Sequence, residues 1–228
     1  MSGAAGSAYG EFAKTRVIVS IFGPRPRDKT AREDPGDSNP LGMQLDCQVH
    51  LPFYRLGEEE EDQGATGTAD RADPVGAGET ASERERRLAK ELEQCILPSI
   101  QQEKLPKTCV EIQCTILETD GREIGPAIMC ASFALAAAEI PLYDLVTYCT
   151  LVSLDNQILL DPTLQELQSS ECEVSLAYMA NRDQINFVRA CGEWNDVHSL
   201  KESMDTCLDG CKKIQRVMRK CLLDTMAD

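Results

Sequence analysis

The stretch PAIMCASFALAAA, residues 126–138, constrains the fold most, because the helix that it predicts is apolar on every side. Proline is favoured in a first helical turn, so Pro126 fits the start of this helix. A helix without a polar face has to be covered from several directions, which requires sheets or other helices around it. The sequence therefore predicts a layered domain with this helix buried at its centre.

Short apolar runs bounded by turn residues surround this helix in the sequence and predict strands. These runs span residues 16–24, 43–53, 109–118, 144–154, 157–163, 172–180 and 184–192. Apolar and polar residues alternate in the second run, as expected of a half-buried strand that pairs with the first. Strands and helices in this order predict an α+β layered fold with mixed sheets, in a single domain over residues 1–228.

Two amphipathic helices and one loop complete the expected elements. Ser82 and Glu85 have the spacing of a capping box, and apolar residues three and four apart follow them up to Ile100. The proline-rich residues 25–42 predict a loop. A second apolar stripe predicts a long C-terminal helix and consists of Trp194, Val197, Leu200, Met204, Cys207, Leu208, Cys211, Ile214, Val217, Met218, Cys221 and Leu222.

The chain of 228 residues has 38 acidic and 23 basic residues, a formal net charge of −15. This charge argues against a protein that binds nucleic acid over its whole surface. Residues 57–83 alone contain nine acids and one base. Segment 55–82 is also glycine-rich and poor in large apolar residues, which predicts a flexible acidic insertion. The remainder is only mildly acidic, and its basic residues gather in short stretches such as Lys212, Lys213, Arg216, Arg219 and Lys220.

The chain has eleven cysteines, which is an odd number, and many of them lie inside apolar runs. Four examples are Cys114, Cys130, Cys149 and Cys191. We therefore expect reduced, buried thiols and a reducing intracellular compartment. Cys207 and Cys211 lie four residues apart on a predicted helix, where core packing is favoured over metal ligation. No metal site and no cofactor are predicted, and no apolar run reaches the ~20 residues of a membrane span.

The turn before the apolar helix has the form of a phosphate-binding site. A glycine turn that leads into a helix N-terminus offers unpaired N–H groups and the positive end of the helix dipole to an anion. Such a site usually also needs a cation, and the candidate here is Arg122, between Asp120 and Glu123. A tight turn that starts a buried helix explains the same residues without any ligand.

Three segments are similar, in order, to signature segments of the RNase PH family of phosphate-dependent 3′ exoribonucleases. They are residues 6–25, 117–146 and 159–179. The middle segment is specific, because it combines Asp-Gly, Ala-Ile, Ala-Ser-x-Ala-Leu-Ala and Ile-Pro-x-x-Asp-Leu-Val. The resemblance implies the RNase PH-like fold, also called ribosomal protein S5 domain 2-like. It also implies a leader and a strand before residue 6, so we expect either a shortened chain or a missing edge strand.

The phosphate turn departs from the family pattern. In active members this turn resembles Asp-Gly-Gly-Thr-Arg-Thr-Ala and holds the attacking phosphate. Asp120 and Gly121 match that motif, whereas Arg122 replaces its second glycine and Ile124 replaces its arginine. An apolar side chain removes a charge-assisted partner worth about 1.5–3 kcal/mol. We therefore expect a degenerate turn that binds no phosphate.

The catalytic acids of the family are altered as well. Asp161 matches the first acid, Leu167 replaces an intermediate one, and Glu173 stands where a late aspartate is expected. Glutamate moves the carboxylate by about one methylene, whereas proton transfer needs heavy atoms within about 3 Å. We expect no catalytic residue, with Asp161 and Glu173 as degenerate counterparts. Turn capping before Pro162 explains Asp161 without catalysis.

Basic residues at the start of the first predicted helix are a further family feature. The resemblance suggests Arg86, Arg87 and Arg122 as possible RNA contacts. Leu88 occupies one of the arginine positions of the family. A solvated helix face explains Arg86 and Arg87 equally well.

Residues 142–163 are most similar to the MTR-type (transport-defective) ring subunits of the eukaryotic RNA exosome. This resemblance implies a non-catalytic structural subunit, paired with an RRP-forty-two-type chain in a hetero-oligomeric ring that forms an RNA channel for RNA processing, including rRNA processing, and degradation. S1/KH cap proteins would sit on the ring, in the nucleus, the nucleolus and the cytoplasm. Two alternatives remain: an active phosphorolytic exoribonuclease that uses Arg122 and Glu173, and a stand-alone RNA-binding protein.

Overall fold

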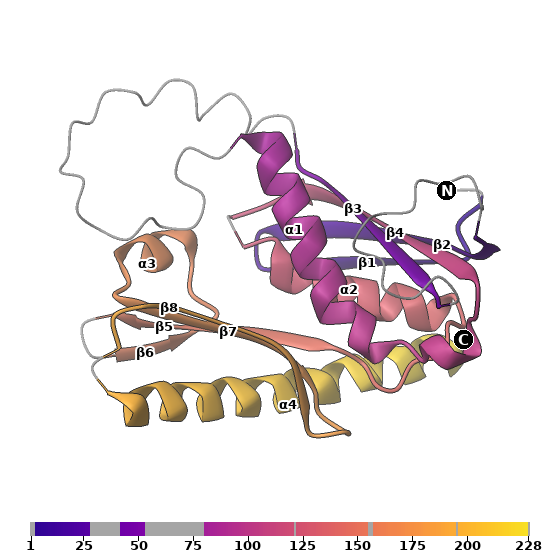
Figure 1. Cartoon of the computed structure of the whole chain (residues 1–228). Coiled ribbons are helices and arrows are strands. Elements are labelled where there is room, and N and C mark those ends of the chain that lie inside the picture. The colour runs from indigo at the N-terminus through magenta and orange to yellow at the C-terminus, as the bar shows by residue number, and fades with distance from the viewer. Residues whose placement is uncertain are drawn as a thin grey trace.

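The computed structural model describes residues 3–27, 42–52, 80–120, 122–154, 157–194 and 196–227. These residues form two four-stranded sheets, which lie side by side in the molecule (Figure 1). The first sheet has the order β1-β2-β4-β3 and consists of β1 (Gly6–Phe12), β2 (Thr15–Pro26), β3 (Gln44–His50) and β4 (Thr108–Glu118). The second has the order β6-β5-β7-β8 and consists of β5 (Thr147–Leu154), β6 (Gln157–Leu160), β7 (Cys172–Met179) and β8 (Gln184–Gly192).

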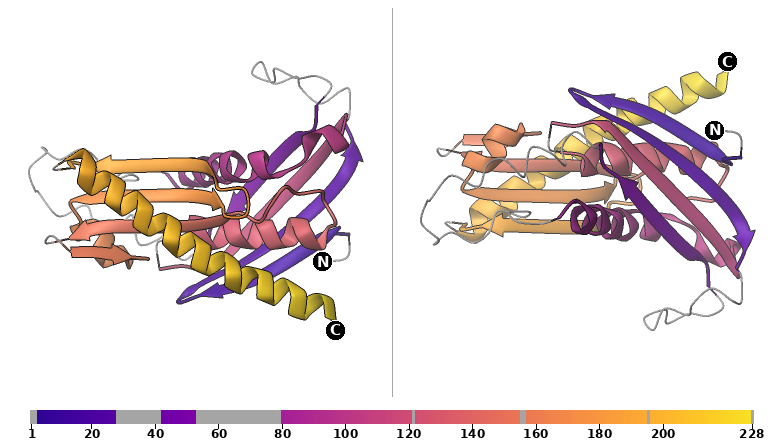
Figure 2. Two further views of the ribbon diagram at one scale, coloured as in Figure 1. Left: turned by 90° about the horizontal axis from the view of Figure 1, so that it is seen from below. Right: turned by 90° about the horizontal axis from the view of Figure 1, so that it is seen from above.

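Helices cover one face of each sheet. The helices of the described ranges are α1 (Ala81–Ile96), α2 (Ile124–Ala137), α3 (Leu164–Ser169) and α4 (Val197–Ala227), with short 3-10 turns η2 (Leu97–Ser99) and η3 (Gln102–Lys104). Helices α1 and α2 pack on the first sheet, and α4 crosses the second sheet diagonally (Figure 2). The predicted α+β fold with mixed sheets, a central buried helix and a long C-terminal helix is confirmed.

Helix α2 is the centre of the structure, as its uniformly apolar sequence predicts. It contacts β1, β2 and β4 of the first sheet, β5 of the second sheet, and α1. Strand β1 runs so close to α2 that a Cβ atom on Gly6 would overlap the backbone of Ala134 and Ala138. A Cβ on Gly10 would overlap the Cys130 sulfur. The two glycines therefore permit the close approach of β1 to the helix.

A second core lies between the second sheet and α4. It is built from Cys149, Leu151, Val174, Leu176, Tyr178, Cys207 and Cys211. The predicted core packing of Cys207 and Cys211 is confirmed, since both are fully buried there. Seven of the eleven free cysteines are buried; Cys191 is only half-buried and Cys221 is exposed. Within the described ranges, no three His, Cys, Asp or Glu side chains form a group that could hold a metal, and no helix is long and apolar enough to cross a membrane.

Strand pairing in the first sheet differs from the expectation. The strand predicted at 43–53 pairs in parallel with β4, not with β2. Strand β1, which the apolar runs did not reveal, occupies the other edge of β2 through a tight hairpin. Helix α1 connects β3 to β4, and a strand–helix–strand connection of this kind places its two strands in parallel.

The start of α1 also differs from the expectation. Thr80, not Ser82, is the N-cap: its hydroxyl oxygen accepts from the Glu83 amide at 3.3 Å, and the Glu83 carboxylate accepts from the Thr80 amide at 2.9 Å. Glu85 instead accepts from the Leu51 amide at 2.9 Å. Thr80 takes the N-cap position because its capping box satisfies backbone amides that would otherwise remain unpaired at the first turn of α1.

Several predicted boundaries of elements and loops also differ from those of the structure. Residues 81 and 82 of the expected insertion 55–82 are helical, and β2 extends through the first two residues of the expected loop 25–42. Most of that loop and of the insertion lie outside the described residues.

The expected stripe of the C-terminal helix is only partly correct. Trp194 precedes α4, and Val197 and Val217 are 82% and 64% exposed. Because α4 crosses only part of the second sheet, its ends leave apolar side chains in solvent. The short helix α3 was not expected; Thr163 caps it and accepts from the Glu166 amide at 3.4 Å.

Candidate functional site

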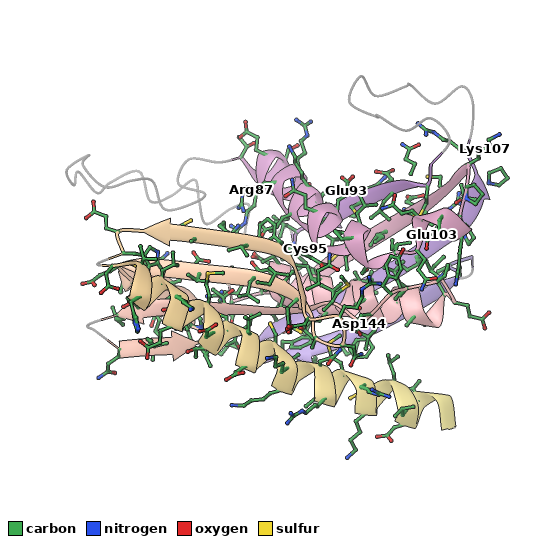
Figure 3. All side chains as sticks on the ribbon, turned by 60° about the horizontal axis from the view of Figure 1, so that its bottom comes forward. Arg87, Glu93, Cys95, Glu103, Lys107 and Asp144 are labelled. Atoms are coloured by element: carbon green, nitrogen blue, oxygen red, sulfur yellow. The ribbon has the colours of Figure 1, made fainter. Side chains whose placement is uncertain are left out.

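The candidate site lies where the N-terminus of α2 and the side of α1 meet the second sheet. The contacts that define it join α1 to the start of α2, α1 to β8, and the turn before α2 to the segment after β6. Figure 3 shows Arg87 on α1 at the side of the second sheet. Polar contacts thus join the α2 N-terminus to α1 and the turn before it to the segment after β6.

The turn before α2 is fastened to the start of β2. The Asp120 carboxylate accepts a hydrogen bond from the hydroxyl of buried Thr15 at 3.0 Å. Gly121 lies outside the described residues. The aspartate that matches the family motif therefore serves here to tie the end of β4 to the neighbouring strand.

Ile124 is the first residue of α2, which begins two residues before the predicted start at Pro126. Its side chain is half-buried and packs against the first core. An apolar side chain there offers neither a charge nor a donor to an anion. The position of the family arginine therefore contributes to packing.

A carboxylate of the chain itself lies beside the α2 N-terminus. Glu123 is the N-cap residue of α2, and its side chain is only 3% exposed. Arg84 of α1 pairs with it at 2.9 Å. A negative charge is favoured next to a helix N-terminus, so Glu123 occupies the electrostatic environment that a bound phosphate would need.

Arg122 is also engaged. Its Nη1 donates to the Pro162 carbonyl oxygen at 3.3 Å, which links the turn to the segment after β6. Asp161, next to that carbonyl, is exposed and has a left-handed φ of 53°. Partial desolvation raises the pKa of Asp161, and the nearby Arg122 charge opposes this without cancelling it. Thr163, not Asp161, caps the following helix α3, and turn capping by Asp161 before Pro162 stays a prediction.

Glu173 belongs to a different set of contacts. Its carboxylate accepts from the Ser175 hydroxyl at 2.8 Å and lies 3.6 Å from Arg189. Arg189 pairs more closely with buried Glu91 of α1, at 2.8 Å. Glu91 also accepts from the Tyr148 hydroxyl at 3.2 Å. This group, here called the Arg189 cluster, fixes α1 to the second sheet.

The strand register separates the two expected acids. The Asp161 amide donates to the Thr150 carbonyl at 2.9 Å, and Thr150 lies opposite Ser175. Glu173 is two residues before Ser175 on β7, so the backbone of β5 lies between the backbones of Asp161 and Glu173. Asp161 shares its surroundings with Asp120 and Arg122, whereas Glu173 faces Arg189.

The remaining predicted residues are distributed along α1 and α3. Arg86 is exposed and Arg87 is half-buried, while Leu88 is buried in the first core. Leu167 is half-buried in α3. Arg86, Leu88 and Leu167 do not belong to the described contacts around Glu123 or Glu173.

Sequence reasoning missed Arg84, Glu91, Tyr148 and Arg189. Glu91 was the sequence signal that could have revealed these contacts. It is an acid between buried Leu88 and Leu92, and a charge on the apolar face of a helix requires a partner.

Acidic side chains outnumber basic ones in this region. The arginines whose contacts are described above are Arg84, Arg122 and Arg189, and the acids beside them are Glu91, Asp120, Glu123, Asp161 and Glu173. Among these eight residues acids are in the majority, which disfavours the binding of a further anion beside them.

Comparisons with known proteins agree with this architecture. Residues 1–141 match the model of the 3′ exoribonuclease family, domain 1, and residues 144–192 match domain 2. The Arabidopsis thaliana exosome complex component RRP41-like is 33% identical over 97% of this chain and 76% of its own length. The Mus musculus exosome complex component MTR3 is 29% identical over 98% of this chain and 79% of its own length.

Two solved structures share the fold. A crystal structure of rice (Oryza sativa) Rrp46 superposes with a TM-score of 0.73 at 18% identity, covering 97% of this chain and 90% of that one. A chain of the Archaeoglobus fulgidus exosome with RNA bound to the active site gives 0.68 at 18% identity, covering 95% and 84%.

Proposed function

The chain belongs to the 3′ exoribonuclease family of RNase PH type, and from this premise we propose that it is a non-catalytic structural subunit of an RNA exosome ring. The names of its relatives support the ring role, since they are exosome complex components. The single observation that supports the absence of catalysis is the Arg84–Glu123 ion pair at the N-terminus of α2. It supports the proposal because a buried carboxylate beside the α2 N-terminus already uses the Arg84 cation that a phosphate would need.

Phosphorolysis requires inorganic phosphate to be held close to the RNA backbone, which is itself an anion. Catalysis of this kind depends on cationic and N–H groups that are preorganised and available for the developing charge. Arg122 donates to the Pro162 carbonyl, and Arg189 is committed to Glu91 and Glu173. Freeing Arg189 would leave the buried carboxylate of Glu91 without its cation, which opposes binding of the substrate.

The proposed partners are other RNase PH-like subunits, in particular an RRP-forty-two-type chain, together with S1/KH cap proteins and RNA passing through the ring. The proposed locations are those of such a complex, the nucleus, the nucleolus and the cytoplasm. Co-purification tests this part of the proposal: we expect five other RNase PH-like subunits to accompany the chain. Recovery of the chain only as a free monomer would rule out the ring role.

A phosphorolysis assay tests the absence of catalysis. The chain, alone and with its ring partners, is incubated with RNA and inorganic phosphate, and released nucleoside diphosphates are measured. A ring with an intact site serves as the positive control. We expect no phosphate-dependent nucleoside diphosphate from complexes in which this chain supplies the only candidate site.

One observation favours the alternative of an active enzyme. The pKa of Asp161 is raised, and a raised pKa is what a carboxyl group needs to act as a general acid near neutral pH. If the alternative were correct, the product would appear in that assay and would disappear in the Asp161→Asn variant. An equal yield from both proteins would indicate a contaminating nuclease.

A further inference from the structure

Helix α4 carries a surface that neither the core nor the candidate site uses. Five cations lie within nine residues, and all five side chains are exposed. They are Lys212, Lys213, Arg216, Arg219 and Lys220, here called the basic face. At 3.6 residues per turn they fall within about 120° of the helix surface and extend over about 12 Å. No acidic residue occurs between Gly210 and Leu223.

The basic face is not explained by the stability of the helix. Cations favour a helix near its C-terminus, but only in the last turn, and the last turn of α4 contains no basic residue. Like charges three and four residues apart, such as Lys212, Arg216 and Lys220, destabilise a helix. The described residues give the face one ion pair, from Lys212 to Asp209 at 4.0 Å. The chain is acidic overall, and yet its basic face brings together positive charges that repel one another.

The basic face belongs to the C-terminal half of α4, and the C-terminal end of this helix extends beyond the second sheet (Figure 2). Val217 and Leu223, on the same part of the helix, are 64% and 60% exposed. Positive and apolar side chains therefore share one accessible surface. Single-stranded nucleic acids are bound by this combination, because cations follow the phosphates while apolar or aromatic groups meet the bases.

A pocket of about 450 Å³ adjoins the basic face, and Arg219 lies in its wall. Ile140 and Leu142 supply an apolar side, and Asp144, Asn181 and Gln215 supply a polar one. The volume falls within the range of small-molecule sites. The pocket is therefore large enough to accept one unstacked base from a strand that lies along α4.

The polar wall of the pocket presents hydrogen-bond acceptors. Buried Asp144, which lies beside α4 in Figure 3, accepts from the Asn181 side-chain amide at 2.8 Å and from that of Gln215 at 3.1 Å. Since a carboxylate only accepts, both amide nitrogens must face it. The described part of the chain provides no donor for the two amide oxygens. The exocyclic amino and ring N–H groups of a base are suitable donors.

We propose that the basic face and this pocket together bind single-stranded RNA. The basic face holds the phosphate backbone and the pocket holds one unstacked base. This site lies outside the region around Glu123, and it goes beyond the ring role, because a scaffold subunit does not itself need an RNA contact on α4. An acidic protein segment is the competing occupant; it would use the cations but has no need of the pocket.

The test measures the affinity of the full chain for a fluorescent oligouridylate over a salt series. The variant Lys212→Gln, Arg216→Gln and Lys220→Gln removes three charges from the basic face. The control Lys14→Gln, Lys104→Gln and Lys201→Gln removes three charges from exposed positions elsewhere. Both sets change the net charge equally, so a general electrostatic effect would appear in both.

We expect the basic-face variant to lose affinity by about tenfold or more, with a salt slope smaller by about 2, since each phosphate contact on a single strand contributes about 0.7. The control should remain within about twofold of the unmodified chain. Equal losses in both variants, or no loss in either, would overturn the proposal. Intact RNA binding combined with failed assembly of the ring would identify an acidic protein as the partner and overturn it as well.

An abasic strand of equal length tests the pocket separately. We expect it to bind several-fold more weakly than oligouridylate, and 4-thiouridine in the strand to cross-link to the segments around Leu142 or Arg219. Equal affinity of the two strands, or cross-links confined to other segments, would contradict a base in the pocket. These outcomes do not depend on phosphorolysis or on co-purification, so they are separable from a failure of the proposed ring role.

Discussion

Glu123 shows how a single residue changes the chemistry of the α2 N-terminus. A carboxylate that is 3% exposed has lost most of its hydration, and its ion pair with Arg84 offsets part of that loss. Arg84 and the helix N-terminus could otherwise stabilise a phosphate. The proposal of a degenerate phosphate site rests on this pairing, because Arg84 already has an anionic partner within the chain.

The ion pair predicts a large effect of a single substitution. Arg84→Ala should lower the free energy of unfolding by about 2–4 kcal/mol, less than for a fully buried pair because Arg84 is 22% exposed. The control Arg86→Ala, on the exposed side of the same helix, should cost less than about 0.5 kcal/mol. Urea denaturation followed by circular dichroism measures both. Similar values for the two variants would show that Glu123 does not depend on Arg84.

Buried thiols predict a loss of stability in alkaline solution. Burial raises the pKa of Cys114 and of Cys130 to about 12, from the 9.0 of a free thiol. Between these values the unfolded chain releases thiol protons that the folded chain keeps, so the free energy of unfolding falls as pH rises from about 9 to 12. Below pH 9 the effect is absent.

Urea midpoints at pH 8 and pH 10 test this dependence. Cys114→Ala removes one titrating thiol, so it should reduce the fall between the two pH values although it lowers stability at both. An unchanged pH dependence in Cys114→Ala would mean that other groups cause the alkaline loss.

Among the elements, α1 connects the two parts of the candidate site. Its N-terminal half supplies Arg84 to the start of α2, and its middle supplies Glu91 to Arg189 on β8. The position of α1 therefore sets both ion pairs, and its first turn is fixed by the Thr80 capping box.

The cap can be tested by a pair of substitutions. Thr80→Ala should lower stability by about 1 kcal/mol, because it leaves amides of the first turn unpaired. Ser82→Ala, at the exposed position that the sequence first suggested as the cap, should change stability by less than about 0.5 kcal/mol. Thermal unfolding of the two variants measures the difference. A larger effect of Ser82→Ala would restore the original interpretation.

Elements with strong apolar patterns could be predicted, and those fixed by packing could not. The uniformly apolar sequence of α2 and the β-branched runs of β2 and β5 are visible because burial on two sides selects such residues. Strand β1 contains Gly6 and Gly10, which weaken a strand pattern, yet these glycines are what let it lie against α2. A local sequence pattern does not show which neighbouring element makes a glycine favourable at such a position.

In the whole molecule, the candidate site forms between two cores. The first core joins α1 and α2 to the first sheet, and the second joins α4 to the second sheet. Arg84 and Glu123 are 39 residues apart in the chain, and Glu91 and Arg189 are 98 apart. The sequence motifs revealed Asp120, Ile124, Asp161 and Glu173, but contacts over such separations become visible only in the folded structure.

The most direct test of the central claim is whether inorganic phosphate binds at the α2 N-terminus. Phosphorus NMR can detect such binding. Phosphate at millimolar concentration is titrated with the purified chain or with its assembled ring, and binding appears as broadening of the phosphate line that saturates. We expect no saturable broadening from the chain, because Glu123 and its ion pair with Arg84 already fill this environment. Saturable binding of one phosphate per chain that is lost in Arg122→Gln would contradict the account.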